Sequence, residues 1–197
     1  MPALMSGIKL IRKVRIAPRA LSLSMPVLGD DGVYAGHKDH DIVKVGRKSL
    51  EEEWSVPAEE YEPHWTRNNR LVCSSIEEGI RALRVEDGGI VWSVRSPYCG
   101  SVYWGGHVLV IPASGLQLRK LETGRLTERI ATPVMPGSAL CGDVFVFLSE
   151  EGDPLDPASR YCDPVSAYSL VSRRVVWRRN LFAEMKERYG VAEERPI

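Results

Sequence analysis

The sequence predicts an all-β protein, a β-propeller built from about four four-stranded blades with a short C-terminal helix. Three observations lead to this fold class. An eleven-residue pattern occurs four times, X-Pro pairs recur at a similar spacing, and short strand-like runs between turn residues fill the intervals. Short strands in repeated units of about 36–49 residues are typical of propeller blades. We expect residues 1–197 to form a single domain.

The eleven-residue pattern is clearest in two segments, "ALRVEDGGIVW" at 82–92 and "AYSLVSRRVVW" at 167–177. Both begin with Ala and end with two β-branched residues and Trp. "LRKLETGRLTE" at 118–128 and "KVGRKSLEEEW" at 44–54 have the same length and are weaker copies. A pattern that returns along the chain predicts that each copy belongs to one supersecondary unit packed on its neighbours.

The last position of the pattern carries a large aromatic residue in three of the four copies. The residues at this position, in steps of 38, 36 and 49, are Trp54, Trp92, Glu128 and Trp177. An aromatic side chain at a fixed place in each unit can dock that unit against the sheet of the next one. We therefore predict that Trp54, Trp92 and Trp177 are structural anchors of the repeat.

The X-Pro pairs set the expected blade boundaries. They are Ala17-Pro18, Val56-Pro57, Ser96-Pro97 and Thr132-Pro133. Proline cannot donate a ladder hydrogen bond inside a sheet, so each pair is expected at the end of a strand. The predicted blades are 18–57, 58–97, 98–133 and 134–181.

Two further elements flank the blades in this prediction. Residues 8–17 show a period-two apolar pattern with β-branched residues, which predicts an outer strand of the same repeat. The C-terminal helix is expected at 181–189, where Asn180 can cap it and Leu181, Met185 and Tyr189 share one face.

A family resemblance lies in the segment "GVYAGHKDHDIVKVGRKSLEEEW" from Gly32, in "ALRVEDGGIVW", and in the Thr-Gly turn of "LETGR". These segments resemble the PQQ-like repeat of the quinoprotein alcohol dehydrogenase-like β-propellers, over roughly residues 8–181. The sequence departs from that repeat at Glu128, which replaces Trp, and at Leu50 and Arg173, which replace the turn Gly. We expect these departures to weaken individual blades.

The resemblance raises the question of a quinone cofactor. Enzymes of this family hold pyrroloquinoline quinone between a Trp and a disulfide formed by adjacent cysteines. Here the four cysteines are widely separated: Cys73, Cys99, Cys141 and Cys162. We therefore expect no cofactor, and we assign no catalytic residue.

Charge and hydropathy argue against some classes of partner. Lys plus Arg and Asp plus Glu number 26 each, so no net field favours nucleic acid or a membrane surface. No apolar run approaches the roughly 18 residues of a membrane-spanning helix. Scattered cysteines are typical of reduced thiols, and we expect a cytoplasmic protein.

Two acidic stretches supply the candidate binding residues. The first, "PAEEYEPHW" at 57–65, contains Glu59, Glu60 and Glu62. The second, "SEEGDPLDPASRYCDP" at 149–164, takes the place of a short hairpin, and its acidic residues are Glu150, Glu151, Asp153, Asp156 and Asp163. On one propeller face the two stretches would form an acidic rim that attracts a basic protein partner. The ligand spacing of an EF-hand is absent, so we favour a protein partner over calcium.

A weaker candidate for a metal site is "GHKDHD" at 36–41, which contains His37, Asp39 and His40. Imidazole and carboxylate ligands suit a transition metal. In the repeat alignment these residues occupy a hairpin turn in which Asp39 is the turn former. We favour that interpretation and expect no metal site.

The regular blades favour a non-enzymatic binding or scaffolding protein that uses the acidic loop face. The alternative is a cofactor- or metal-binding enzyme, or an enzyme subunit, with its site at the central channel. For the oligomeric state, we slightly favour a homodimer that completes a larger ring, each chain lending its N-terminal strand. A four-bladed monomer is the other expectation.

Overall fold

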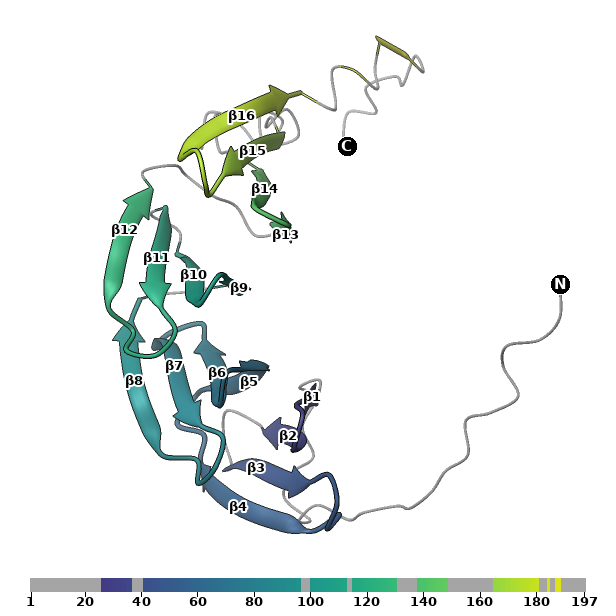
Figure 1. The fold of residues 1–197 in the computed structure, drawn as a ribbon, viewed down its shortest axis with the longest axis vertical. Helices are drawn as coiled ribbons and strands as arrows, with labels where there is room; N and C mark the ends of the chain where they lie inside the picture. The colour runs from purple at the N-terminus through teal and green to yellow at the C-terminus, as the bar shows by residue number, and fades with distance from the viewer. Residues whose placement is uncertain are drawn as a thin grey trace, which may run out of the picture. The chain divides into compact units, whose positions relative to one another are not determined.

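The computed structural model describes residues 26–36, 41–96, 100–112, 115–130, 138–148 and 165–180, together with Glu184, Glu187 and Arg188. These residues form four antiparallel sheets of four strands each (Figure 1), which confirms the predicted all-β fold. The predicted strand at 8–17 lies outside the described residues. Of the predicted helix at 181–189, only Glu184, Glu187 and Arg188 are described, and all three are helical.

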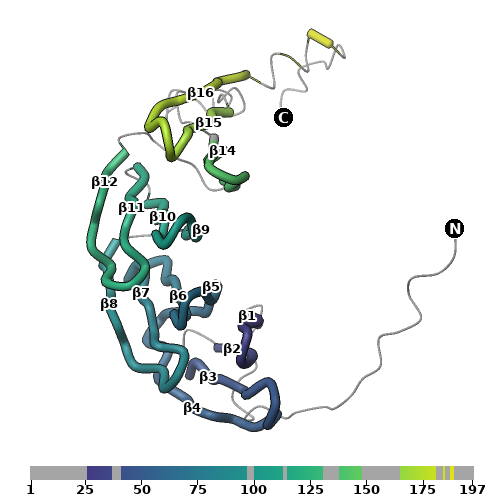
Figure 2. The backbone as a smooth tube through the Cα atoms, in the orientation of Figure 1, coloured from purple at the N-terminus to yellow at the C-terminus, as the bar shows by residue number. Residues whose placement is uncertain are grey.

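Each sheet is a meander in which consecutive strands pair, as the tube in Figure 2 shows. The first sheet contains β1 (Val27–Leu28), β2 (Gly32–Gly36), β3 (Asp41–Gly46) and β4 (Glu52–Pro57). The second contains β5 (Glu62–Arg67), β6 (Arg70–Ser75), β7 (Gly79–Arg84) and β8 (Ile90–Arg95). The third contains β9 (Gly100–Trp104), β10 (His107–Ile111), β11 (Leu116–Lys120) and β12 (Leu126–Ile130). The fourth contains β13 (Ala139–Cys141), β14 (Val144–Leu148), β15 (Val165–Ser169) and β16 (Arg174–Arg179).

Position within the sheet determines the sequence pattern of each strand. The third strands of the first two sheets, β3 and β7, are buried over five consecutive residues. A strand covered on both faces is expected to be nearly continuous in apolar residues, and "IRAL" in β7 is close to this. The outer strands β4 and β12 alternate between exposed and partly buried residues. They therefore keep the period-two pattern of a half-covered strand.

The chain divides into two compact units, one of residues 1–75 with 81–91 and one of residues 76–80 with 92–197. Each unit has its own apolar cluster. The buried residues of the first cluster are Tyr34, Ile42, Ala58, Tyr61, Leu71, Cys73, Leu83 and Val85. Those of the second are Leu109, Ile111, Leu116, Leu118, Phe145, Phe147, Tyr168 and Leu170. The single-domain organisation stays a prediction.

The eleven-residue pattern corresponds to the hairpin between the third and fourth strands. Its first and last residues lie opposite each other, as Lys44 and Trp54, Leu118 and Glu128, and Ala167 and Trp177 do. In these three sheets the pairing register shifts directly after the first residue, as a β-bulge would cause. The shared bulge and turn explain why the copies have one length.

Two of the three predicted anchors dock one sheet on the next. The indole nitrogen of Trp54 donates a hydrogen bond to the carbonyl oxygen of Val85 at 2.9 Å. The indole nitrogen of Trp92 donates to the carbonyl oxygen of Leu121 at 2.7 Å. Val85 and Leu121 both occupy the fourth position of the following eleven-residue segment. The same contact is therefore made twice, and the repeated Trp has a physical explanation.

Among the described residues, none of the helical segments has the length and apolar character needed to cross a membrane.

Candidate functional site

The first acidic stretch forms a tight turn with an unusual backbone. The amide of Tyr61 donates to the carbonyl of Ala58 at 3.0 Å, which closes the turn. Glu59 and Glu60 between them have φ values of 50° and 71°. Residues other than glycine rarely adopt such left-handed values, because Cβ approaches the following carbonyl. Ala58 and Tyr61 are buried, while both glutamates are exposed.

Arg81, from β7, contacts two residues of this turn. Its Nη2 atom lies 2.9 Å from Oε2 of Glu59, and its guanidinium carbon lies 4.0 Å from the centroid of the Tyr61 ring. The residue is only 9% exposed. Among the described residues, its Nε atom has no hydrogen-bond partner. The buried cation therefore depends on Glu59 and the Tyr61 ring for compensation.

Cys73 is fully buried in the apolar cluster of the first unit. Burial raises the pKa of its thiol well above the ordinary value, and the positive charge of Arg81 offsets this only in part. A thiol with a raised pKa carries no thiolate at neutral pH, so it is neither a nucleophile nor a good metal ligand. Cys73 therefore has a packing role here.

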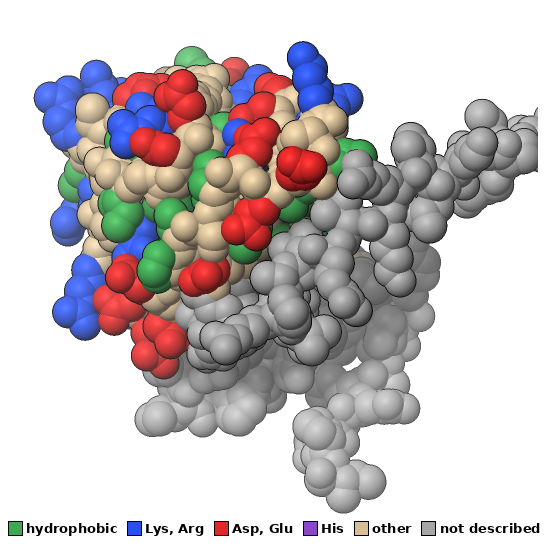
Figure 3. All heavy atoms as spheres, turned by 90° about the horizontal axis from the view of Figure 1, so that it is seen from below, with side chains coloured by type: hydrophobic (Ala, Val, Ile, Leu, Met, Phe, Trp, Pro, Cys, Tyr) green, Lys and Arg blue, Asp and Glu red, His purple; other side chains and the backbone are tan. Residues whose placement is uncertain are grey.

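The three predicted acidic residues of this stretch lie within a few residues of one another, and Glu62 begins β5 in a partly buried position. The predicted residues of the second stretch, Glu150, Glu151, Asp153, Asp156 and Asp163, lie outside the described residues, as do the metal candidates His37, Asp39 and His40. Within the described residues, no group of three or more His, Cys, Asp or Glu side chains could hold a metal ion. On the face of the molecule that Figure 3 shows, acidic side chains lie among basic and apolar ones.

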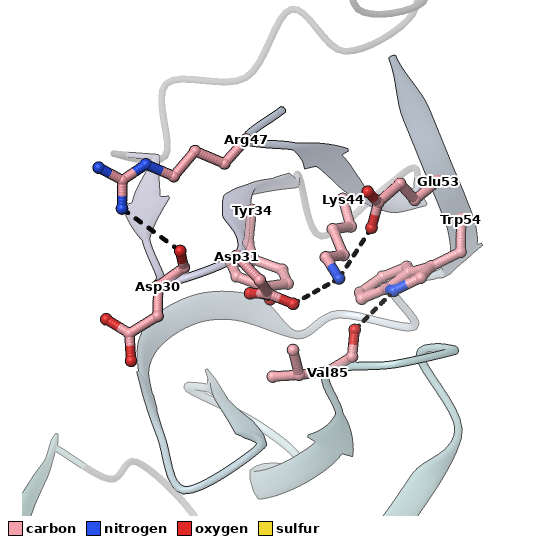
Figure 4. A network of polar contacts seen from close by, with 8 residues as sticks. All are labelled: Asp30, Asp31, Tyr34, Lys44, Arg47, Glu53, Trp54 and Val85. Carbon is pink, nitrogen blue, oxygen red and sulfur yellow. Dashed lines mark hydrogen bonds and ion pairs between the residues drawn. The ribbon is translucent and has the colours of Figure 1, made fainter. Parts of the chain in front are cut away.

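A second polar cluster lies on the first sheet, shown in Figure 4. The ammonium group of Lys44 in β3 lies 2.6 Å from Oδ2 of Asp31 and 2.8 Å from Oε2 of Glu53. The hydroxyl group of Tyr34 donates to Oδ1 of Asp31 at 2.7 Å. Lys44 itself is buried. The two carboxylates hold the ammonium group beside the first of the anchoring tryptophans.

The pKa values in this cluster follow from its contacts. Burial works against the charged form of Lys44, but the hydrogen bonds and charges of Asp31 and Glu53 outweigh it and raise the pKa. For Asp31, partial burial is likewise outweighed, and the hydrogen bonds from Lys44 and Tyr34 lower the pKa of the carboxyl group. Burial, followed by the bond to Asp31, raises the pKa of Tyr34. All three groups keep their ordinary charge at neutral pH, which suits a structural brace.

Sequence reasoning missed Lys44 and Arg81, although Lys44 left a signal. It occupies the first position of its eleven-residue segment, where the other three segments have Ala82, Leu118 and Ala167. A charged residue at a position that is otherwise apolar predicts a buried ion pair. Arg81 lies between Ile80 and Ala82 on a strand buried on both faces, and it left no comparable signal.

The third predicted anchor, Trp177, has the same register as Trp54 but a different environment. Its side chain is 42% exposed, whereas that of Trp92 is 8% exposed. Its strand β16 is the last strand that the structure describes, so no following turn among the described residues receives the indole. The anchoring role of Trp177 stays a prediction.

Comparison with known proteins supports the fold alone. No family model matches the chain, and no curated protein matches it. The solved structure of BamB from Moraxella catarrhalis is similar with a TM-score of 0.62 and 11% identity, over 78% of this chain and 48% of that chain. The computationally designed Ika8 protein is similar with a TM-score of 0.60 and 12% identity, over 79% of this chain and 48% of that chain.

A third similar structure, the computationally designed Ika4 protein, has a TM-score of 0.54 and 12% identity, over 74% of this chain and 89% of that chain. The chain thus spans about half the length of BamB and of Ika8. At these identities the likeness concerns architecture and carries no function. Together with the four meander sheets, it shows that the chain has a β-propeller fold.

Proposed function

We propose that this chain is a non-enzymatic β-propeller of PQQ-like blades that binds or scaffolds a protein partner through the acidic turn Ala58–Tyr61. The observation that carries the proposal is the pair of left-handed glutamates, Glu59 and Glu60. Each such residue costs about 1–2 kcal/mol relative to glycine. A turn that only reversed the chain would be more stable with Gly or Asn at these positions. Strain retained at exposed carboxylates is typical of a binding site.

The chemistry of the turn favours a basic partner. The carboxylate of Glu59 forms an ion pair with Arg81, and Arg81 packs on the Tyr61 ring. The carboxylate is therefore held in place before a partner binds. A pre-ordered group loses less conformational entropy on binding. Phosphate groups would be repelled, which argues against nucleic acid. The acidic residues of 149–164 belong to the same proposal as further candidate binding residues.

The alternative function is a cofactor- or metal-binding enzyme, or an enzyme subunit, with its site at the central channel. Thermal unfolding of the full chain with Ca²⁺, Zn²⁺ or pyrroloquinoline quinone tests it. A ligand that binds the native state alone raises the unfolding temperature by mass action. Stabilisation by several degrees that Glu59→Gln removes would favour the alternative over the binding protein. Cytoplasmic localisation and a homodimer remain part of the proposal.

The substitution Glu60→Gly tests the binding role, because stability and binding should change in opposite directions. Glycine adopts the φ of 71° without strain, but it also gives the unfolded chain more conformational freedom. The variant should therefore gain up to about 1 kcal/mol of stability, less than the full cost of the strain. Capture of partner proteins from native lysate, quantified by mass spectrometry, should fall about tenfold for the specific partner. A variant that is more stable and still retains every partner would contradict the proposal.

A matched control is Glu86→Gln. Glu86 is an exposed carboxylate in the turn between β7 and β8, at the end of the second sheet opposite the acidic turn. It should leave both stability and capture unchanged. Equal loss of capture in Glu60→Gly and Glu86→Gln would indicate a general charge effect without a specific site.

A further inference from the structure

The first residues of the chain are basic and include no acid. Residues 1–29 contain five Lys or Arg residues and no Asp or Glu. Three of the five, Lys9, Lys13 and Arg15, fall on odd positions of the period-two segment 8–17. In an extended segment alternate side chains point to the same side, so these three cations would share one face. The segment therefore has the charge and the spacing of a ligand for an acidic surface.

Carboxylates gather at the end of the first sheet where the acidic turn lies. Asp41 pairs with Pro57, the last residue of β4, and the turn follows directly. The side chains of Asp41, Glu59 and Glu60 are exposed, and Glu62 begins the next strand in a partly buried position. These four residues, Asp41, Glu59, Glu60 and Glu62, form the acidic end of the first unit.

Arg81 indicates that the acidic end takes a further group. Its Nη2 atom contacts Glu59, and its Nε–H lies on the same edge of the planar guanidinium group. Arg81 is only 9% exposed, and its Nε atom has no hydrogen-bond partner among the described residues. A buried N–H is rarely left without an acceptor. A chain segment that lies across the turn brings main-chain carbonyl groups as well as cations, which a metal ion or a single amine does not.

The chain enters the first unit beside the strand that follows the acidic turn. This strand is β5, whose first residue is Glu62, and β1 lies next to it. A Cβ atom built on Gly29, directly after β1, would lie 3.2 Å from Oγ1 of Thr66 in β5. The residues between Arg15 and β1 can span roughly 35 Å when extended, whereas the six residues of β5 extend over about 20 Å. The segment 8–17 can therefore reach the acidic end.

We propose that the basic segment 8–17 of this chain binds the acidic end, with Lys9, Lys13 and Arg15 toward the carboxylates. A tethered segment acts at an effective concentration on the order of millimolar, so a contact that is weak between separate molecules is largely formed within one chain. The segment then occupies the surface that the proposed partner needs, and the partner must displace it. The contact itself stands without a partner, and only this autoinhibitory role rests on the proposed function.

Carbodiimide cross-linking of the full chain tests the contact, because the reagent joins a lysine amine to a carboxylate where the two are in contact. Digestion and mass spectrometry should find Lys9 or Lys13 joined to a carboxylate of the acidic end within one chain. The yield should fall about fivefold in about 0.5 M salt, since exposed ion pairs are screened. Links from these lysines to other carboxylates alone, links that join two chains, or no links would overturn the proposal.

A peptide of residues 8–17 tests whether the acidic end is occupied. The probe is the synthetic peptide IKLIRKVRIA with a fluorescent label, and its anisotropy is measured as the full chain is added. The wild type should bind it about tenfold more weakly than the triple variant Lys9→Gln, Lys13→Gln and Arg15→Gln, because the tethered segment competes with the peptide. Equal affinity for the two proteins, or no binding to either, would overturn the proposal.

The matched control carries Arg12→Gln and Arg19→Gln, which remove positive charge outside the proposed contact face. It should bind the peptide as the wild type does, and a gain equal to that of the triple variant would overturn the proposal. In the triple variant, Glu60→Gln should weaken peptide binding by about two- to fivefold, whereas Glu86→Gln should leave it unchanged.

Capture of partner proteins separates this proposal from the proposed function. The triple variant should capture more of the specific partner than the wild type does, because the competing segment has been removed. A triple variant that binds the peptide more tightly and captures no more partner would support the contact and contradict the partner. A variant that captures more partner without binding the peptide more tightly would contradict the contact alone.

Discussion

The carboxylate of Glu128 and the guanidinium of Arg173 lie 3.4 Å apart, at the two positions that elsewhere in the chain hold an indole and a glycine. The sequence alone predicted that both departures from the repeat weaken their blades. The structure shows that they face each other and form one junction. Replacing one member without the other therefore disrupts a contact, whereas replacing both can restore the Trp–Gly geometry.

A double-mutant cycle with Glu128→Trp and Arg173→Gly measures this relationship. Glu128→Trp alone should lower the free energy of unfolding, because the Arg173 side chain occupies the position where the indole ring would lie. The double variant should be more stable than the sum of the single changes by about 1–3 kcal/mol, a range found for residues in contact. Urea unfolding of the four proteins gives the coupling free energy. A value near zero would contradict the pairing of the two positions.

The matched cycle uses Glu128→Gln and Arg173→Gln, which remove the charges and keep the shapes. The Arg173 side chain is 69% exposed, and a pair at such a site contributes about 0.2–1 kcal/mol. The coupling in this cycle should therefore be smaller than in the first. It should also fall as salt is added.

Gly124→Ala tests the close approach of backbone and indole. The added Cβ would lie 2.8 Å from the Trp92 ring at a φ of +66°. The strained φ costs about 1–2 kcal/mol, and the forced repacking about 1–3 kcal/mol more. The unfolding midpoint in urea gives the total.

Gly142→Ala is the control for that change. Gly142 has a φ of +58°, and a Cβ there would have nothing within 4 Å. It should cost only the backbone strain, about 1–2 kcal/mol. Equal losses at the two glycines would mean that the indole moves aside without cost.

Trp92→Ala and Trp177→Ala separate an occupied anchor from an unoccupied one. Trp92 is buried and donates to Leu121, so its removal leaves a cavity and an unpaired carbonyl and should cost about 3–5 kcal/mol. Trp177 is partly solvated, and its removal should cost less than about 2 kcal/mol. Thermal unfolding of the two variants compares them. Equal losses would show that Trp177 is already docked in solution.

The sequence was sufficient to predict the sheets, because the hairpin between the third and fourth strands recurs with the same length and the same pairing of its first and last residues. Trp54 and Trp92 recur at one position, since each donates its indole N–H to the carbonyl at the same position of the next segment. The contact between Glu128 and Arg173 could not be predicted in the same way. To predict it, one must know which positions face each other across two sheets, and a single segment does not contain that information. The strain at Glu59 and Glu60 is likewise a property of backbone angles that no residue pattern displays.

The Lys44 cluster makes the stability of the first sheet depend on pH at both extremes. The pKa of Asp31 is lowered from 3.8 on folding, so its contribution is present above that value and is lost as pH falls through the lowered pKa. The pKa of Lys44 is raised from 10.5, so its contribution is present below that value and is lost as pH rises through the raised pKa. Between the two the stabilisation is constant.

Lys44→Met should remove the loss of stability at alkaline pH. It should also reduce the loss at acid pH, because Asp31 then lacks the hydrogen bond and the charge of Lys44 and keeps its bond from Tyr34. At neutral pH the change should be within about 1–2 kcal/mol, since an apolar side chain often replaces a buried ion pair at little cost. Asp31→Asn should destabilise more, because the buried ammonium group then has only the carboxylate of Glu53 to balance its charge among the described residues. Thermal unfolding from pH 3 to about pH 11 distinguishes these outcomes, and the exposed Lys48→Met is the control for loss of one positive charge. An alkaline loss that persists unchanged in Lys44→Met would show that another group causes it.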